Sequence, residues 1–324
     1  MKAQKVITPQ KRARFCISVV LFAGVLMLGL NLLLPTVGVL PLMFLTDGDL
    51  AQNELLWMLF EMTVYFLVIA LTGTFLLIVF RKSPLSAFRG PLSTTKFPFL
   101  FIPAAMGLFY LLNLVIGIVF EKPLEPFNFP TDETSYPGTT LGVALYCLLI
   151  SVMPAILEEW LFRGIMQKNL APAIGRTPAI VISALVFGLM HSHPSQSVFA
   201  FVFGLVAGYA FDKTGSIWFG ALIHMFNNAV SFVATYWYDV YHVEMADAIF
   251  GIFVLCMIGI FVISIPIYIV TAIHTKKKFA RKNDAERLIP TAGKITKMTL
   301  CNPFLYVLIA GYCGLLWLLY FVVV

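Results

Sequence analysis

Long apolar runs recur along the whole chain, and they restrict its fold more than any other feature of the sequence. A helix needs about 20 predominantly apolar residues to cross the hydrocarbon core of a bilayer, which is roughly 30 Å thick. A membrane β-barrel would instead show short segments of alternating hydrophobicity. The chain is 60% hydrophobic and only 12% charged, which excludes a soluble domain of this size. The sequence therefore predicts an all-α polytopic membrane protein with about eight to nine transmembrane helices.

We divide the chain into nine apolar segments. They are residues 15–45, 55–80, 98–120, 140–157, 178–191, 197–211, 217–237, 248–273 and 304–324. Segments 178–191 and 197–211 are too short, because helices of that length reach only about 21 to 23 Å. The turn between them, from His191 to Gln196, is polar and contains a proline. We expect these two segments to form a hairpin that enters from the cytoplasm and turns back within the membrane.

The charges between the segments predict the orientation of the chain. If each segment crosses the membrane, successive loops lie on alternate sides. In that arrangement 21 of the 22 Lys and Arg residues fall on one side, and Lys122 falls on the other. Basic loops stay cytoplasmic, so we expect a multi-pass protein of the cell membrane with a cytoplasmic amino terminus and an external carboxyl terminus. Anionic lipid headgroups are a sufficient partner for the net charge of +6, and no nucleic acid is needed to explain it.

Polar residues at membrane depth cluster in the middle of the chain. On insertion scales an ionisable side chain at the centre of a bilayer costs at least about 2.5 to 3.5 kcal/mol, so each one calls for a reason. The candidates are Glu158, Glu159, Arg163, His191, His193, His224, Asn227 and Asn228. We therefore predict three regions: a three-span region (1–138), a helical core with a membrane-embedded polar cavity (139–237), and two final spans with a basic cytoplasmic loop (238–324).

Three of these residues lie in the stretch Glu158-Glu159-Trp-Leu-Phe-Arg163. If the helix that begins near Thr140 continues through it, Glu159 and Arg163 are four positions apart, in the favourable order for an ion pair. Glu158 is rotated by about 100° from Glu159 and can face elsewhere. This predicts a structural pair, Glu159 with Arg163, and a freer carboxylate, Glu158. Alternatively, all three are interface residues at the cytoplasmic end of a helix.

Two further pairs repeat the four-residue spacing, Phe187 with His191 and His224 with Asn228. Each pair lies on one face of its predicted helix. A single histidine in a membrane helix often only joins neighbouring helices by a hydrogen bond. Polar elements on three successive segments favour a shared site instead.

These motifs resemble the CAAX protease and bacteriocin-processing family of membrane endopeptidases, also called the Abi family. That family carries EExxxR, FxxxH and HxxxN or HxxxD on different membrane helices. Here the motifs read Glu158 to Arg163, Phe187 to His191 and His224 to Asn228, in that order. The resemblance extends over about residues 141–236, and the remaining spans carry no motif of this kind.

The resemblance implies that Glu158 and His191 activate a water molecule, while His224 and Asn228 donate hydrogen bonds to the oxyanion. Glu159, Arg163 and Phe187 would support them. The chemistry is consistent with this, because a carboxylate in a low-dielectric cavity is a stronger base than in water, and two donors on one helical face can meet developing negative charge. We expect no cofactor. The alternative is a catalytic zinc ion bound by Glu158, His191 and His224, although no HExxH motif is present.

The sequence thus predicts a hydrolase that cleaves a hydrophobic or lipidated peptide or protein. Two other functions stay open. The same fold could serve as a non-catalytic membrane scaffold or immunity protein that retains the polar residues for packing. A proton-coupled transporter would also combine short helices with buried Glu and His, although the chain has no internal repeat.

Overall fold

The computed structural model describes residues 8–45, 54–88, 101–121, 136, 139–191, 193–241, 251–256, 258–264, 266 and 289–322. Helices make up most of this part of the chain. Their bounds are α1 (Pro9–Leu45), α2 (Glu54–Phe80), η2 (Pro84–Phe88), α3 (Phe101–Ile116), η4 (Gly117–Glu121), α5 (Thr140–Glu158), η6 (Glu159–Gln167), α6 (Lys168–Ile174), α7 (Arg176–Gly188), α8 (Pro194–Thr214), α9 (Ile217–Tyr241), α11 (Ala292–Leu300) and α12 (Pro303–Val322). A further helical stretch lies between residues 251 and 264.

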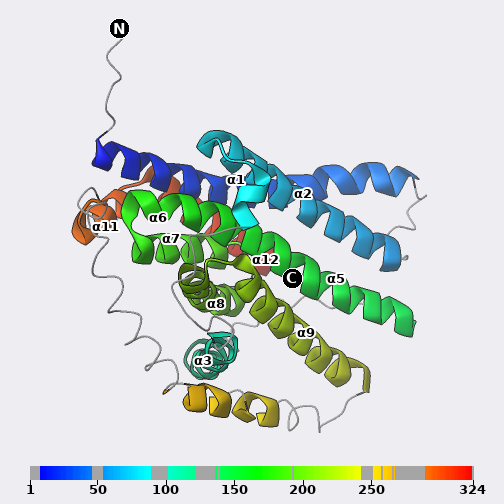
Figure 1. The fold of residues 1–324 in the computed structure, drawn as a ribbon. Coiled ribbons are helices and arrows are strands. Elements are labelled where there is room, and N and C mark those ends of the chain that lie inside the picture. Colours follow the sequence, from blue (N-terminus) through cyan, green and yellow to red (C-terminus); the bar gives the residue numbers. More distant parts are fainter. Residues whose placement is uncertain are drawn as a thin grey trace.

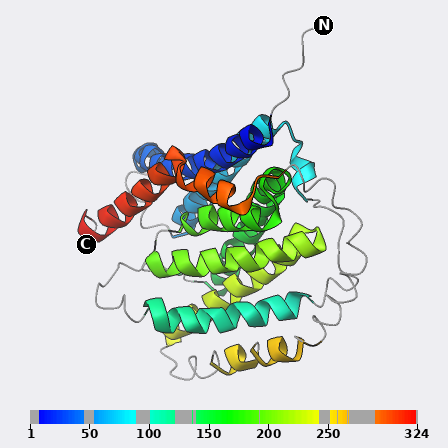
Figure 2. The same ribbon diagram turned by 90° about the vertical axis from the view of Figure 1, so that its left-hand side faces the viewer.

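The helices pack side by side in a stack (Figures 1 and 2). At each end of the stack, segments that are far apart in sequence lie together. Helices α1, α2 and α12 lie at one end, and α3 and residues 251–264 lie at the other. Between them, α5, η6 and α6 run without interruption from Thr140 to Ile174. Helix α7 packs against α8, and α9 packs against α5. The motif-bearing helices therefore occupy the middle of the stack.

The described residues contain five helices that are long and apolar enough to cross a membrane, or six if the bent pair α11 and α12 is one span. This agrees with a polytopic membrane protein, but it is fewer than the eight or nine spans expected. Helix α3 has 16 residues and α7 has 13, so both fall short of the length needed. Much of the predicted segment 248–273, and most of the basic loop before α11, lies outside the described residues.

The predicted hairpin of two short helices is wrong for its second member. Helix α7 is short, as expected, but α8 has 21 residues and is long enough to span. The helix begins earlier than the apolar run because Pro194 occupies its first turn, where its fixed φ suits a helix. It ends at Gly215, whose φ of 70° is a left-handed conformation that glycine adopts easily. The residues at the two helix ends, Pro194 and the C-cap Gly215, rather than hydropathy, set the length of α8.

Helices α7 and α8 approach closely at small residues. A Cβ atom added to Gly204 would lie 2.8 Å from the Cβ of Ala184, and one added to Gly188 would lie 2.8 Å from the carbonyl oxygen of Ser197. Backbones that meet without side chains between them pack tightly, as small residues allow in membrane helices. This close packing holds the end of α7, and with it His191, against the start of α8.

Candidate active site

The helix that starts at Thr140 continues through the EExxxR motif, but not with regular α geometry. Residues Glu159 to Gln167 form the π-helix η6. Every residue of η6 except Trp160 is buried, including the charged Glu159 and Arg163. Such π-helical turns are rare and occur frequently at functional sites. The motif therefore lies inside the protein, and the alternative of a cytoplasmic interface at a helix end does not apply to Glu159 and Arg163.

Glu159 and Arg163 form the ion pair expected from their spacing. The Nη1 atom of Arg163 lies 2.7 Å from Oε1 of Glu159, and the two side chains are 1% and 0% exposed. Gly220 of α9 makes room for the carboxylate, because a Cβ at that position would contact Oε2 of Glu159. A charge buried this deeply is tolerated only with its partner, so each member of the pair depends on the other.

The π-helix is joined to α8 by two hydrogen bonds that repeat every four residues. Arg163 donates from Nη2 to the carbonyl oxygen of Gly204 at 3.3 Å, and Gln167 donates from Nε2 to that of Gly208 at 2.8 Å. Gly204 and Gly208 form a GxxxG spacing, in which the missing side chains leave backbone carbonyls accessible. Ser183 of α7 completes the attachment by donating to the carbonyl oxygen of Phe162 at 2.8 Å.

Two aromatic rings pack between the Arg163 guanidinium and the histidine rings, while Nδ1 of His224 lies 3.9 Å from Oε1 of Glu159. The guanidinium of Arg163 lies 4.9 Å from the ring centre of Phe187 and 5.6 Å from that of Phe203. The Phe187 ring also lies 5.0 Å from the His191 ring, and the Phe203 ring lies 4.6 Å from the His224 ring. Phe187, the aromatic residue of the FxxxH motif, thus contacts both the cation and a histidine. The two rings therefore pack against both the guanidinium and the imidazoles.

Glu158 forms no ion pair with Arg163 and has a hydrogen-bond partner of its own, although His224 lies near both glutamates. Its Oε1 accepts a hydrogen bond of 2.5 Å from the hydroxyl of Tyr65 on α2. Its Oε2 has no hydrogen-bond partner among the described residues and lies 3.6 Å from Nε2 of His224. One oxygen of Glu158 is therefore held in place, while the other is buried beside His224 without a hydrogen-bond partner among the described residues.

The backbone contact of His191 defines which of its nitrogens is available. Its Nδ1 lies 3.0 Å from the carbonyl oxygen of Phe187, one turn earlier. Because a carbonyl can only accept a hydrogen bond, Nδ1 carries the proton in this contact. In the neutral ring Nε2 then has a lone pair. His191 is in this way prepared to accept a proton or a hydrogen bond at Nε2.

Asn228 is positioned by a proline in the neighbouring helix. Pro154 of α5 has no N–H group, so the carbonyl oxygen of Ile150 lacks its usual helical partner. Nδ2 of Asn228 donates to that oxygen at 3.4 Å, and Asn227 donates to Oδ1 of Asn228 at 3.5 Å. Polar side chains commonly satisfy backbone groups that proline frees in membrane helices. The second N–H of the Asn228 amide is left for another acceptor.

The structure brings the four predicted site residues to one cavity of about 1470 Å³. Glu158, His191, His224 and Asn228 all line it, together with Tyr65. Glu159 and Arg163 are not among the lining residues, although Phe187 is. His193, another polar residue of the sequence cluster, precedes α8 as its N-cap and does not line the cavity. Of the two adjacent glutamates, Glu158 therefore lines the cavity, whereas Glu159 lies outside the cavity lining in the buried ion pair.

A comparison with protein families adds an independent finding. Residues 140–230 match the family model described as type II CAAX prenyl endopeptidase, Rce1-like. Over this region, which is less than a third of the chain, the protein is similar to the CAAX protease family. The resemblance predicted from the three motifs is thereby confirmed, and all three fall inside the matched residues. Searches of curated proteins and of solved structures find no match. This similarity agrees with the several apolar helices of a multi-pass membrane protein.

The site residues do not form a metal site in the described part of the chain. No group of three His, Cys, Asp or Glu side chains there is arranged to hold a metal ion. The alternative ligand set of Glu158, His191 and His224 is therefore not preassembled among the described residues, although Nε2 of His191 keeps its lone pair. We assign no step of the chemistry to a metal.

Two residues of the site were absent from the sequence motifs. Tyr65 lies 93 positions before Glu158, in an apolar span that carries no family pattern. Phe203 lies in the predicted segment 197–211 but in none of the three motifs. A hydroxyl within a membrane helix was the only signal for Tyr65, and no sequence signal distinguished Phe203 from other apolar residues. Both enter the site through contacts between helices.

Proposed function

We propose that this protein is an intramembrane endopeptidase that hydrolyses a peptide bond in a hydrophobic or lipidated peptide or protein. The observation that carries the proposal is the convergence of Glu158, His191, His224 and Asn228 on one cavity, with Oε2 of Glu158 available beside an imidazole. The similarity of residues 140–230 to the CAAX prenyl endopeptidase family supports the same reaction class.

Glu158 is the proposed general base. It takes a proton from a water molecule through Oε2 while the water oxygen bonds to the scissile carbonyl carbon. His191 orients this water through Nε2, and Tyr65 holds the other carboxylate oxygen in place. When the carbon–nitrogen bond breaks, Glu158 returns the proton to the departing amine. The carboxylate ends the cycle as it began, so no other proton donor is needed.

His224 and Asn228 are the proposed oxyanion donors. They are four positions apart on one face of α9, and both line the cavity. The Nε2–H of His224 and the second amide N–H of Asn228 would meet the negative charge that develops on the carbonyl oxygen. Donors that are held in place beforehand need no reorganisation during the reaction. Phe203 against His224 and Ile150 against Asn228 supply that restraint.

The proposed setting is the cell membrane, with the amino terminus cytoplasmic, the carboxyl terminus external and the lipid bilayer as immediate surroundings. The distribution of Lys and Arg supports this orientation. A substrate with an apolar or prenylated segment would reach the cavity from the bilayer. No nucleic acid and no cofactor have a part in the proposal. Activity that survives exhaustive chelation would support hydrolysis without a metal.

The decisive test compares full-length wild type with Glu158→Gln in detergent, on a farnesylated peptide ending in Cys-aliphatic-aliphatic-X. The amide keeps an acceptor for Tyr65 but cannot take a proton, so kcat should fall about 10²- to 10⁴-fold. The free energy of unfolding, measured by intrinsic fluorescence during heating, should stay within about 1 kcal/mol of the wild-type value, since the substituted group is similar in shape. Full activity in Glu158→Gln would refute the peptidase proposal and favour a scaffold or a transporter.

A further inference from the structure

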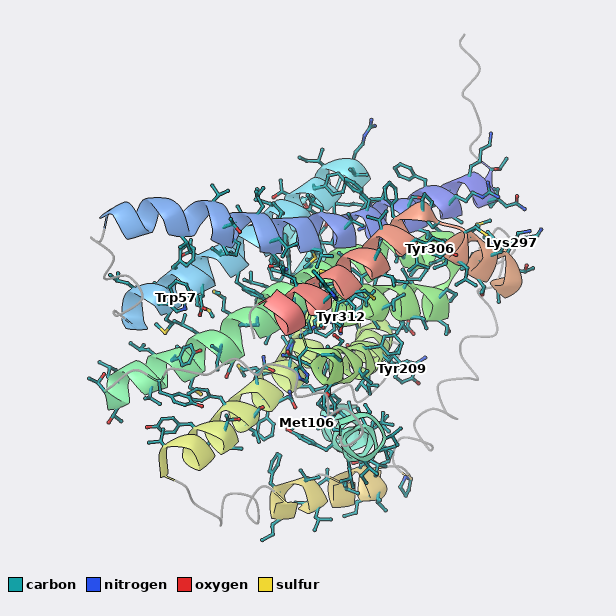
Figure 3. The ribbon with its side chains drawn as sticks, turned by 180° about the vertical axis from the view of Figure 1, so that it is seen from behind. Trp57, Met106, Tyr209, Lys297, Tyr306 and Tyr312 are labelled. Atoms are coloured by element: carbon teal, nitrogen blue, oxygen red, sulfur yellow. The ribbon has the colours of Figure 1, made fainter. Side chains whose placement is uncertain are left out.

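One face of α3 and η4 lines the cavity. The lining residues follow a helical stripe, with Phe109, Tyr110, Asn113 and Leu114 from α3 and Gly117 and Ile118 from η4. Helix α3 packs against α8 and α9, at the far end of the stack from α1 and α2 (Figures 1 and 2). Figure 3 shows α3 end-on, with its residue Met106 labelled, between α8 and the helical stretch of residues 251–264. The proposed mechanism uses none of these residues.

Two polar groups on this face are buried without a partner. Tyr110 is 4% exposed, and its hydroxyl has no hydrogen-bond partner in the described part of the protein. The Oδ1 atom of Asn113, one turn further on, is likewise buried and unpaired among the described residues. Buried polar groups are nearly always satisfied, and each exception needs an explanation. A ligand that enters the cavity would supply the missing partners.

The chemistry of these groups identifies the ligand class. The Tyr110 hydroxyl donates and Asn113 Oδ1 accepts, which matches a peptide carbonyl and a peptide N–H. Neither group is charged, and the cavity lining named for the described residues contains no Lys or Arg to pair with a free carboxylate. An acyl or prenyl chain has no hydrogen-bonding group to offer. The pair is therefore suited to the neutral backbone of an extended peptide.

The all-helical fold explains why side chains, rather than backbone groups of the protein, must form hydrogen bonds with a bound peptide. Backbone groups of a peptide inside a membrane cavity need hydrogen-bond partners, because the surroundings supply no water. Many peptide-binding proteins provide them from the edge of a β-sheet, but no sheet exists among the helices described here. We infer that Tyr110 and Asn113 form a substrate subsite that binds the peptide backbone away from the scissile bond. This inference rests on the proposed peptidase function.

The test uses full-length Tyr110→Phe and Asn113→Leu with the farnesylated peptide named above. Each loses one hydrogen bond to the bound peptide, so KM should rise about 5- to 30-fold with little change in kcat. Because the Tyr110 hydroxyl has no hydrogen-bond partner among the described residues, Tyr110→Phe should unfold at the same temperature as wild type or higher. Tyr312→Phe is the matched control: its hydroxyl lies 2.5 Å from Ser197 Oγ, so unfolding temperature should fall and KM should not change.

A substrate change locates the contact. Replacing one amide of the peptide substrate by an ester, away from the scissile bond, removes the N–H group that would donate a hydrogen bond to Oδ1 of Asn113. On the ester at the matching position, Asn113→Leu should have no further effect, whereas on the amide it should keep its full effect. Unchanged KM in Tyr110→Phe, or equal effects of Asn113→Leu on every ester and the amide, would overturn the subsite. If Glu158→Gln is inactive while Tyr110→Phe behaves as wild type, only the subsite fails; if Glu158→Gln is active, the proposed function fails.

Discussion

Glu158 and Glu159 are neighbours in the chain, yet they belong to two polar regions with opposite properties. The cavity cluster contains Glu158, Tyr65, His191, His224 and Asn228, whereas the buried pair is Glu159 with Arg163. In the buried pair a carboxylate faces a fixed guanidinium at 2.7 Å. In the cavity cluster, one oxygen of Glu158 is held by a hydroxyl and the other is available.

The difference shows that the partner, not the residue type, decides what a buried carboxylate does. A carboxylate neutralised by Arg is a poor proton acceptor and a good structural element. A carboxylate that is positioned by a neutral donor and faces a cavity keeps its basicity for chemistry. The π-helix begins at the boundary between the two glutamates. We expect substitutions in one region to change folding and substitutions in the other to change catalysis.

The largest effect should come from breaking the buried pair. Arg163→Ala or Glu159→Gln leaves one charge buried without its partner, so the free energy of unfolding should fall by about 3 to 5 kcal/mol. Folded yield after gel filtration and unfolding temperature measure this. Arg176→Ala is the control, because Arg176 is half exposed and 3.5 Å from Asp212, where loss of the pair should cost about 1 kcal/mol or less. Normal yield of Arg163→Ala would contradict the distinction between the regions.

A large effect on catalysis, rather than on folding, is expected from a substitution of Asn228. Asn228→Ala removes a proposed oxyanion donor, so kcat should fall about 10²- to 10³-fold while folded yield stays near that of wild type. Asn227→Ala is the matched neighbour: it also lines the cavity but has no proposed contact with the reacting atoms. Its kcat should fall less than tenfold. Equal losses in both variants would mean that the amides pack the helices rather than stabilise an oxyanion.

The smallest effect should be that of Tyr65→Phe. It removes the hydrogen bond to Glu158 Oε1 without touching the reacting oxygen, so kcat should fall about tenfold with KM unchanged. A merely structural role would instead lower the unfolding temperature and leave kcat of the folded fraction intact. Steady-state kinetics on material that has been purified by size distinguishes the two outcomes. Tyr312→Phe, outside the cavity lining, should leave kcat unchanged.

Much of the site follows from local helical geometry, which the sequence contains. The four-residue spacing of Glu159 and Arg163 predicted their ion pair, because both residues lie on one helix and need no other element to meet. The three motifs predicted the family. The length of α8 was predicted wrongly, since Pro194 and Gly215 extend the helix beyond its apolar run. The division into three regions, the orientation and the roles of the site residues stay predictions.

By itself, the sequence determined the membrane class, the order of the motif-bearing helices and the residue types able to do the chemistry. These depend on composition and on neighbours within one or two helical turns. Only the tertiary structure decided that Tyr65 holds Glu158 and that the carbonyl freed by Pro154 meets Asn228. Each of these depends on side chains from different helices, and hydropathy carries no information about which faces of two helices meet. The physical reason is that packing, not propensity, sets the partners of a polar group in lipid.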